Sequence, residues 1–91
     1  MVWTVKYTIS FQKNVQKLDR SVQKKIKCFF EQTELIENPR QKGKPLTANL
    51  SGLWRYRIED YRIICEIQDS EMIVLALRVG HRDKVYKKSF T

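Results

Sequence analysis

The stretch LWRYRIEDYRIICEI, residues 53–67, joins two runs in which apolar and polar side chains alternate. Such alternation is typical of β-strands, whose successive side chains point to opposite faces of a sheet. Glu59 and Asp60 separate the runs and predict the two-residue loop of a β-hairpin. One face of this hairpin is basic and the other is apolar. The apolar face carries Trp54, Tyr56, Ile58, Tyr61, Ile63, Cys65 and Ile67.

The two-residue loop predicts the pairing of the two strands, because it sets Ile58 opposite Tyr61. In this register Arg57 lies directly opposite Arg62. Like charges that face each other across two strands are destabilising. A chain that keeps both arginines there is predicted to hold an anion between them.

The residues before the hairpin predict one strand and two helices. Residues 2–9 alternate like a half-buried strand, whose buried side would carry Trp3, Val5, Tyr7 and Ile9. From Phe11 the apolar spacing changes to three and four residues, which is typical of one helical stripe. This stripe contains Phe11, Val15, Leu18, Val22, Ile26, Phe29, Phe30, Thr33 and Ile36. Ser10 is the expected N-cap of the first helix, and a break is expected near residues 18–21.

The residues after the helices predict a loop and, beyond the hairpin, a third strand of a meander. The Asn38–Pro39 pair is expected to end the second helix, because proline disfavours a helical residue before it. Residues 40–52 contain glycine, proline and basic side chains and predict a loop. Residues 68–71 predict a polar turn, and residues 72–79 a nearly all-apolar central strand. Its expected core face carries Ile73, Leu75, Leu77 and Val79.

These elements predict an α+β fold. It consists of an N-terminal strand, a two-helix hairpin and a three-stranded antiparallel meander, with the helices on one face of the sheet. Residues 1–91 are expected to form a single domain with one modest core. A cytoplasmic protein is expected, because there is no apolar run of membrane-spanning length and no signal-peptide layout. Cys28 and Cys65 lie in apolar patterns and are expected to be reduced core residues.

The net charge of +8 is concentrated in two segments. Residues 40–57 carry five basic and no acidic side chains, and residues 78–91 carry five basic side chains and one aspartate. Such clustering indicates a phosphate backbone or an acidic protein as partner. Strand alternation places several arginines together on the sheet face away from the helices. This predicted basic face carries Arg55, Arg57, Arg62, Arg78 and, if the last strand continues, Arg82. The alternative is a surface of salt bridges that involves Glu66.

The C-terminal segment adds groups that can transfer protons. Histidine is the side chain whose unperturbed pKa lies nearest neutrality, which makes His81 a candidate for proton transfer. Tyr86 lies near Lys84, Lys87 and Lys88 in the sequence, and these lysines favour a phenolate. Each of these two residues taken alone is more often structural than functional. The chain has one histidine, two dispersed cysteines and no clustered carboxylates, so no metal site and no cofactor are expected. RNA cleavage suits this inventory, because RNA supplies its own nucleophile, the 2′-hydroxyl group.

The order of elements, with LTANLSGLWRYRIEDYRIICEI (residues 46–67) and VGHRDKVY (residues 79–86), resembles the RelE/ParE superfamily of toxins from bacterial type II toxin–antitoxin systems. The RelE branch is the most similar. The resemblance implies an mRNA interferase: a ribosome-dependent endoribonuclease that enters the A site of the 30S subunit, cleaves mRNA and inhibits translation. It also implies that an acidic antitoxin wraps the protein and inactivates it.

The resemblance also assigns roles to individual residues. Arg62 and Arg82 match the phosphate-binding arginines of the family, and Tyr86 matches its C-terminal tyrosine. Arg55 and Arg57 stand where RelE has lysines, and arginine is a poor general base because it stays protonated. Proton transfer is therefore expected of Tyr86 or His81. The expected catalytic residues are Arg62, His81, Arg82 and Tyr86, and the expected RNA- or phosphate-binding residues are Lys42, Lys44, Arg55, Arg57, Arg78 and Lys84.

Two other functions fit the same fold. A ParE-like protein would inhibit a protein target such as DNA gyrase and catalyse no reaction. A non-catalytic RNA-binding module would use the basic face alone. The presence of Arg62, His81, Arg82 and Tyr86 in one chain favours the nuclease.

Overall fold

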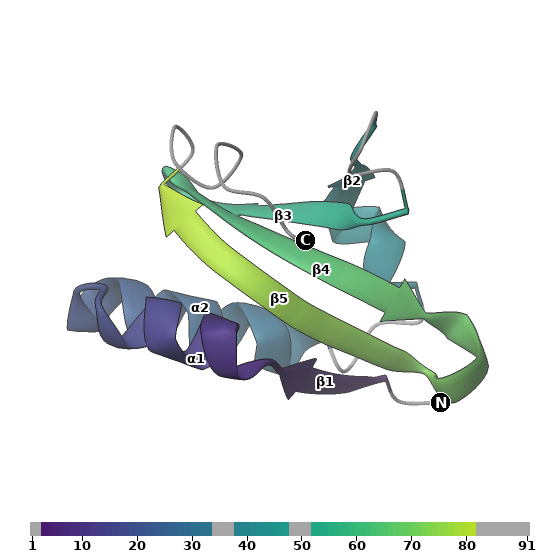
Figure 1. Cartoon of the computed structure of the whole chain (residues 1–91), viewed down its shortest axis with the longest axis horizontal. Coiled ribbons are helices and arrows are strands. Elements are labelled where there is room, and N and C mark those ends of the chain that lie inside the picture. The colour runs from purple at the N-terminus through teal and green to yellow at the C-terminus, as the bar shows by residue number, and fades with distance from the viewer. Residues whose placement is uncertain (1–2, 34–37, 48–51, 82–91) are drawn as a thin grey trace.

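The computed structural model describes residues 3–33, 38–47 and 52–81 of the chain. They form a five-stranded sheet with two α-helices along one side (Figure 1), which confirms the expected α+β class. None of these helices is long and apolar enough to cross a membrane. The elements follow the chain as β1 (Thr4–Tyr7), α1 (Ile9–Gln16), α2 (Arg20–Thr33), the short 3-10 helix η1 (Pro39–Lys42), β2 (Gly43–Pro45), β3 (Trp54–Ile58), β4 (Tyr61–Gln68), the 3-10 helix η3 (Asp69–Glu71) and β5 (Ile73–His81).

The strands lie in the order β1-β5-β4-β3-β2, with β1 parallel to β5 and all other neighbours antiparallel. The predicted hairpin register is confirmed, because Ile58 pairs with Tyr61 and Arg57 pairs with Arg62. Glu59 in the loop has a φ of 53°, a left-handed conformation that is common in tight hairpin loops. Lys25 of α2 forms an ion pair with Glu59 at 3.0 Å, so this loop is also tied to the helix layer.

The helical hairpin begins earlier than expected. Thr8, and not Ser10, is the N-cap of α1. The Thr8 hydroxyl oxygen accepts a hydrogen bond from the Phe11 amide at 3.1 Å, and the hydroxyl donates one to the Leu77 carbonyl oxygen at 2.9 Å. The second bond ties the start of α1 to β5, which a cap at position 10 would not do. Ile9 is therefore helical and 72% exposed, where a buried strand position was expected.

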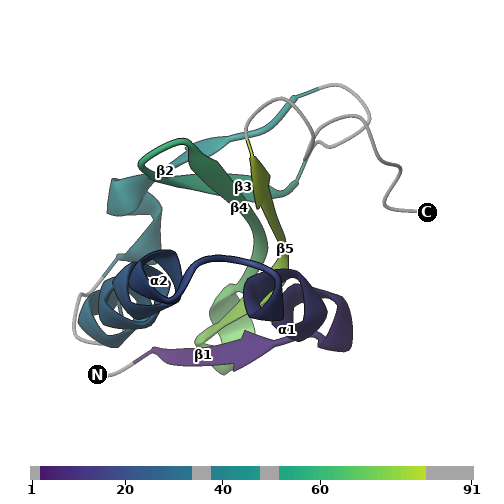
Figure 2. The same cartoon turned by 90° about the vertical axis from the view of Figure 1, so that its left-hand side faces the viewer.

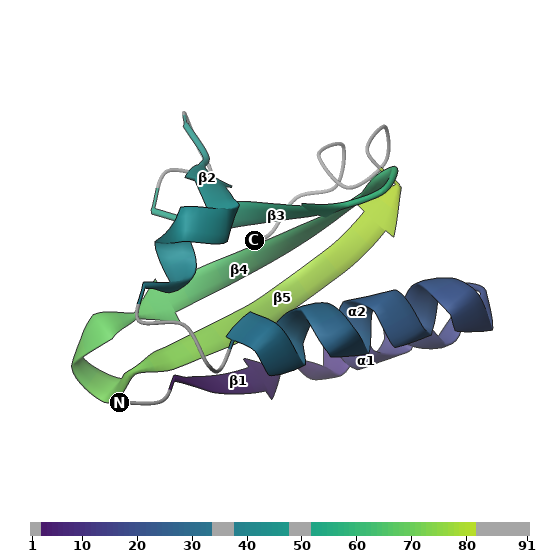
Figure 3. The same ribbon diagram turned by 180° about the vertical axis from the view of Figure 1, so that it is seen from behind.

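The core lies between the helices and the sheet. Figures 2 and 3 show α1 and α2 side by side along the same side of the sheet. The ring of Phe30 packs edge-on against that of Tyr56, with centroids 6.1 Å apart. Tyr56 is fully buried, and its hydroxyl donates a hydrogen bond to the Pro39 carbonyl oxygen at 2.8 Å. The predicted helical stripe is thereby confirmed for its buried members Phe11, Val22, Ile26, Phe30 and Thr33. Ile36 lies outside the described residues.

The two cysteines differ in environment. Both are free thiols, and Cys65 is buried as expected. Burial raises the pKa of the Cys65 thiol to about 12. Cys28 is exposed, so its expected place in the core was wrong. The apolar stripe of α2 passes through Phe29 and Phe30, and Cys28 lies outside this stripe.

Strand β5 contains a β-bulge that reverses its alternation. Cys65 pairs with Ala76, whereas the adjacent Ile64 pairs with Arg78, so Leu77 is an extra residue on β5. Val74 and Ala76 are buried before the bulge, and Val79 is buried after it. The expected core face was therefore right for Val79. It was wrong for Ile73, Leu75 and Leu77, which are partly exposed.

Residues 43–45 form the edge strand β2 where a loop was expected. Gly43 pairs with Tyr56, and Lys44 pairs with Arg55. A Cβ atom on Gly43 would lie 2.9 Å from the Arg55 carbonyl oxygen, so glycine permits this close pairing. Proline is tolerated at the end of the strand because an edge strand leaves one side unpaired.

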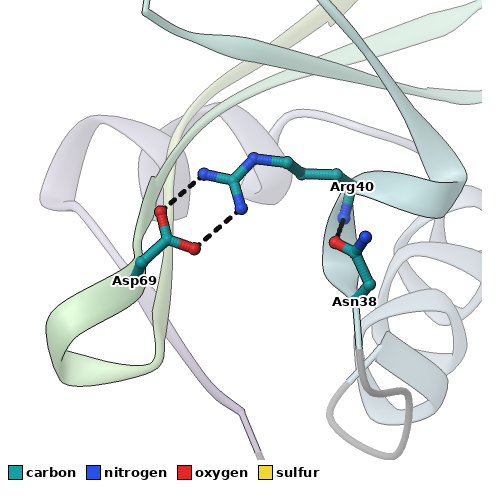
Figure 4. A network of polar contacts seen from close by, with 3 residues as sticks. All are labelled: Asn38, Arg40 and Asp69. Carbon is teal, nitrogen blue, oxygen red and sulfur yellow. Dashed lines mark hydrogen bonds and ion pairs between the residues drawn. The ribbon is translucent and has the colours of Figure 1, made fainter.

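An ion pair holds η1 against η3 (Figure 4). The Arg40 guanidinium donates two hydrogen bonds to the Asp69 carboxylate, at 2.7 and 2.6 Å. Asn38 orients this segment, because its side-chain oxygen accepts a hydrogen bond from the Arg40 amide at 3.0 Å. The Arg40 guanidinium also lies 5.5 Å from the centre of the Trp54 ring. The hydrogen bonds from Arg40 hold the pKa of the Asp69 carboxyl below its usual value.

Candidate functional site

Two rows of side chains cross the sheet on the face away from the helices. Residues paired directly across antiparallel strands share a face, so the strand register places each member of a row. The first row runs across β2, β3, β4 and β5 and contains Lys44, Arg55, Ile64 and Arg78. The second runs across β3, β4 and β5 and contains Arg57, Arg62 and Gly80. The predicted basic face is therefore present within the described residues.

Exposure varies across this face. Arg57 and Lys44 are exposed, and Arg55 and Arg78 are half-buried. Ile64 is fully buried between the two arginines of its row. The Arg57 Nε donates a hydrogen bond to the Glu59 carbonyl oxygen at 3.3 Å, which holds this side chain at the hairpin loop.

Arg62 differs from the other arginines of this face because it is buried, with an exposure of 8%. Its Nε and Nη1 atoms are buried, and no hydrogen-bond acceptor reaches them among the described residues. A buried guanidinium without an acceptor is costly, and an oxyanion is the ligand that would satisfy both donors. Gly80 has no side chain and lies directly opposite Arg62 on β5. These features make Arg62 the centre of a candidate anion site.

His81 lies at the end of β5 on the other face of the sheet from Arg62. It pairs directly with Tyr61, and the two rings meet edge to face at 5.9 Å and 81°. His81 is exposed, whereas Tyr61 is half-buried against the core. The structure thus brings His81 to the strand end that bears Arg62 but not onto the same face. Tyr61 was missed by the sequence reasoning, because the bulge at Leu77 shifts the register, and regular pairing from Cys65 and Ala76 would have set Tyr61 opposite Gly80.

The remaining predicted site residues lie elsewhere. Lys42 points toward the helix layer, with its Nζ 5.3 Å from the centre of the Phe29 ring. It is therefore apart from the basic face. Arg82, Lys84 and Tyr86 lie outside the described residues.

Acidic side chains near the basic face have other partners. Glu66 accepts a hydrogen bond from Gln68 Nε2 at 2.6 Å. Lys25–Glu59 and Arg40–Asp69 are ion pairs within the described ranges, and neither involves Glu66. In the same ranges, no three residues of the types His, Cys, Asp and Glu cluster as metal ligands would.

Comparisons with known proteins point to one family. Residues 5–86 match the family described as "ParE toxin of type II toxin-antitoxin system, parDE". The chain is 31% identical to toxin RelG of Mycobacterium tuberculosis over 88 residues, which cover 97% of this chain and 100% of that protein.

Solved structures of toxin–antitoxin complexes share the fold. A chain of the toxin–antitoxin complex RelBE2 from Mycobacterium tuberculosis superposes with a TM-score of 0.81 and 30% identity, covering 90% of this chain and 100% of that chain. A chain of the archaeal RelE–RelB complex from Pyrococcus horikoshii superposes with a TM-score of 0.72 and 25% identity, covering 93% of this chain and 100% of that chain.

Proposed function

The chain belongs to the ParE toxin family of type II toxin–antitoxin systems, within the RelE/ParE superfamily, and on that premise we propose that it is a ribosome-dependent endoribonuclease that cleaves mRNA in the A site. The observation that carries this proposal is the buried guanidinium of Arg62, whose Nε and Nη1 lack acceptors among the described residues. An RNA phosphate supplies the charge and the oxygen acceptors that this group needs. Arg55, Arg57 and Arg78 on the same face supply further charge for neighbouring phosphates.

The chemistry follows from the substrate and the available side chains. The 2′-hydroxyl oxygen attacks the adjacent phosphorus, and the bond from phosphorus to the 5′ oxygen breaks. Tyr86 or His81 assists by removing the 2′ proton or protonating the leaving oxygen. Arg62 and Arg82 stabilise the charge that develops on the phosphorane. The upstream fragment then ends in a 2′,3′-cyclic phosphate or its 3′-phosphate product, and the downstream fragment begins with a 5′-hydroxyl.

A translation reaction tests this proposal. Purified toxin is added to programmed ribosomes, and primer extension maps cuts on the mRNA. We expect cuts at A-site codons, no cuts in an mRNA with 2′-deoxyribose at the scissile position, and no effect of a chelator beyond its effect on the ribosome. Cleavage of the 2′-deoxy substrate at the normal rate would contradict the mechanism.

Two variants distinguish the proton-transfer residues. Tyr86→Phe removes the phenol proton and keeps the ring, so we expect it to slow single-turnover cleavage more than it weakens binding if Tyr86 transfers the proton. His81→Ala is the companion variant. Its exposed position on the Tyr61 face predicts that the fold survives this change.

Inhibition of a protein target such as DNA gyrase is the second candidate, and the match to the ParE family supports it. This function requires no buried, unsatisfied arginine. Absence of RNA cleavage with programmed ribosomes, together with inhibition of purified gyrase, would establish the second candidate over the first.

We also propose that an acidic antitoxin protein inactivates this toxin. The structural relatives are chains of complexes with RelB antitoxins. The net charge of +8 favours an acidic partner.

A further inference from the structure

A hollow of about 410 Å³ lies between α2 and the end of β3 that leads into the hairpin loop. Phe29 and Ile58 supply its apolar lining. Positive charge comes from both sides, since α2 contributes Lys24 and Lys25 and β3 contributes Arg57. None of the described side chains that line the hollow is acidic. An anionic ligand with an apolar part would therefore fit the hollow.

Arg57 connects this hollow to the basic face of the sheet. Its side chain lines the hollow, and the strand register sets it directly opposite Arg62. The outer edge of β3 carries no paired strand here among the described residues, because the last residue pair between β2 and β3 is Gly43 with Tyr56. Figure 3 shows β2 at the opposite end of β3 from the hairpin loop. A ligand strand bound at Arg62 can thus pass Arg57 and continue around the edge of β3 into the hollow.

The aromatic ring in the hollow belongs to Phe29. This half-buried side chain packs on the Tyr56 ring, with centroids 4.9 Å apart, and part of its remaining surface lines the hollow. The Lys42 Nζ lies 5.3 Å from the centre of the Phe29 ring and adds a further positive charge. The nearby carboxylate of Glu59 is paired with Lys25 at 3.0 Å. An aromatic surface among cations is typical of sites for unpaired nucleotides, whose bases have apolar faces and whose phosphates are anionic.

Continuity with Arg62 favours a nucleic-acid strand over an acidic peptide as the ligand. The buried guanidinium of Arg62 needs an oxyanion, and Arg57 joins that position to the hollow. A phosphodiester strand carries one anion at every nucleotide, so consecutive phosphates can meet Arg62, Arg57 and the lysines of α2 in turn. The same strand also brings bases that can pack against the apolar lining.

Resting on the proposed function, we propose that the hollow between α2 and the outer edge of β3 is a binding subsite for an unpaired nucleotide of the cleaved mRNA, close in the strand to the phosphate at Arg62. The base packs against Phe29 and Ile58. Its phosphate pairs with the cations at the rim of the hollow. The subsite holds the strand and does not touch the reacting atoms, so its loss should raise the toxin concentration that cleavage requires.

Binding of RNA tests this subsite without any cleavage. The probe is an end-labelled, single-stranded oligonucleotide of 2′-O-methyl RNA, which lacks the attacking 2′-hydroxyl, and fluorescence anisotropy follows its binding to the full chain. Lys24→Gln/Lys25→Gln removes two exposed charges from the hollow. The matched control, Lys13→Gln/Lys17→Gln, removes two exposed charges outside it. We expect the first variant to bind about tenfold more weakly than the control. Equal binding by the two variants would overturn the proposal.

Two substitutions of Phe29 separate aromatic contact from charge. Phe29→Leu removes the ring and keeps an apolar side chain, whereas Phe29→Tyr keeps the ring. We expect the first to weaken binding about tenfold and the second to bind much as the natural sequence does, because bases stack on aromatic side chains. Thermal melting checks each fold, and the lysine variants decide the matter if Phe29→Leu unfolds.

Cys28 reports on the hollow independently, because its exposed thiol lines it. We expect saturating oligonucleotide to slow the alkylation of Cys28 in the natural sequence. An unchanged alkylation rate would overturn the proposal.

Abasic nucleotides then show whether the hollow holds mRNA or ribosomal RNA. The natural sequence and Phe29→Leu are added to ribosomes programmed with mRNAs that carry one abasic nucleotide at successive positions around the A-site codon. At one position we expect the abasic change to raise the half-maximal toxin concentration for the natural sequence but not for the variant. Additive effects at every position would overturn the assignment to mRNA and favour ribosomal RNA as the ligand.

The outcomes separate this subsite from the nuclease proposal. If nothing cleaves but the hollow variants alone lose the oligonucleotide, the nuclease proposal fails and the hollow stands as an RNA-binding site. If cleavage proceeds and the hollow variants bind RNA as the lysine control does, the subsite fails alone.

Discussion

Arg62 is buried beside a second positive charge, because the hairpin register sets Arg57 directly opposite it. An unpaired buried charge costs free energy, and a like charge across the strand adds to that cost. We therefore expect Arg62→Ala to abolish mRNA cleavage while the melting temperature stays the same or rises. Primer extension on programmed ribosomes measures the first effect, and circular dichroism on heating measures the second.

Arg57→Ala is the matched control for this variant. It removes the same repulsion but keeps the guanidinium of Arg62, so we expect a similar melting temperature and a smaller loss of cleavage. Arg57 is exposed, which makes its phosphate contact weaker than that of a buried group. An Arg62→Ala protein that still cleaves, or one that unfolds, would show that Arg62 serves the fold instead.

The two thiols predict a simple labelling experiment. The thiolate is the reactive form, and burial raises the pKa of the Cys65 thiol to about 12, whereas Cys28 is exposed. An alkylating reagent at neutral pH should therefore modify Cys28 alone in the folded protein and both thiols in denaturant. Mass spectrometry of the peptides identifies the site. Rapid alkylation of Cys65 in the folded protein would contradict the described core, and Cys28→Ser provides the unlabelled control.

Elements that combine a tight turn with strict alternation could be predicted from the sequence, as the hairpin of β3 and β4 shows. Its two-residue loop leaves one register that puts apolar faces together, so the pairing of Arg57 with Arg62 followed directly. Strand β5 could not be predicted in the same way. It is apolar at nearly every position, so the sequence does not show which of its side chains face the core. The bulge at Leu77 also reverses the alternation of buried positions along the strand.

Sequence signals also failed where tertiary contacts decide the structure. Gly43 and Pro45 are loop residues by local preference, yet pairing with β3 makes this segment a strand. Thr8 and Ser10 are both good N-cap residues, and the hydrogen bond from Thr8 to β5 selects the first. The anion site was predicted as a pair of facing arginines. The burial of Arg62 was not predicted, because arginine is almost never buried unless it is paired.

The ion pair between η1 and η3 predicts a pH dependence. The Arg40 guanidinium lowers the pKa of Asp69, so the folded pKa lies below the unfolded value. Asp69 therefore adds stability above the unfolded carboxyl pKa, near 3.9, and this stability is lost as pH falls through the folded pKa. We expect the difference in urea midpoint between the natural sequence and Asp69→Asn to shrink as pH falls from about 5 to about 3. A difference that does not change with pH would exclude this pair as its source. Asp60→Asn, at an exposed hairpin position, is the control.

At the scale of the whole molecule, the sheet and the helix layer carry different kinds of basic surface. The sheet face presents arginines around a buried isoleucine, Ile64. The helix layer presents an apolar groove with a basic end. The first suits a phosphate backbone.

The net charge of +8 predicts how salt acts on the association with an acidic antitoxin. Attraction between oppositely charged proteins speeds their encounter, and salt screens it over a distance that falls from about 10 Å at 0.1 M to about 3 Å at 1 M. We therefore expect the association rate to fall steeply with added sodium chloride, while the dissociation rate, set by close contacts, changes less. Stopped-flow fluorescence at several salt concentrations measures the first rate, and displacement by unlabelled toxin measures the second. The variant Lys24→Glu/Lys27→Glu should reduce the salt dependence of the association rate, because the two substitutions lower the net charge from +8 to +4. An association rate that does not depend on salt, or tight binding to a neutral partner, would show that apolar contact alone drives the encounter.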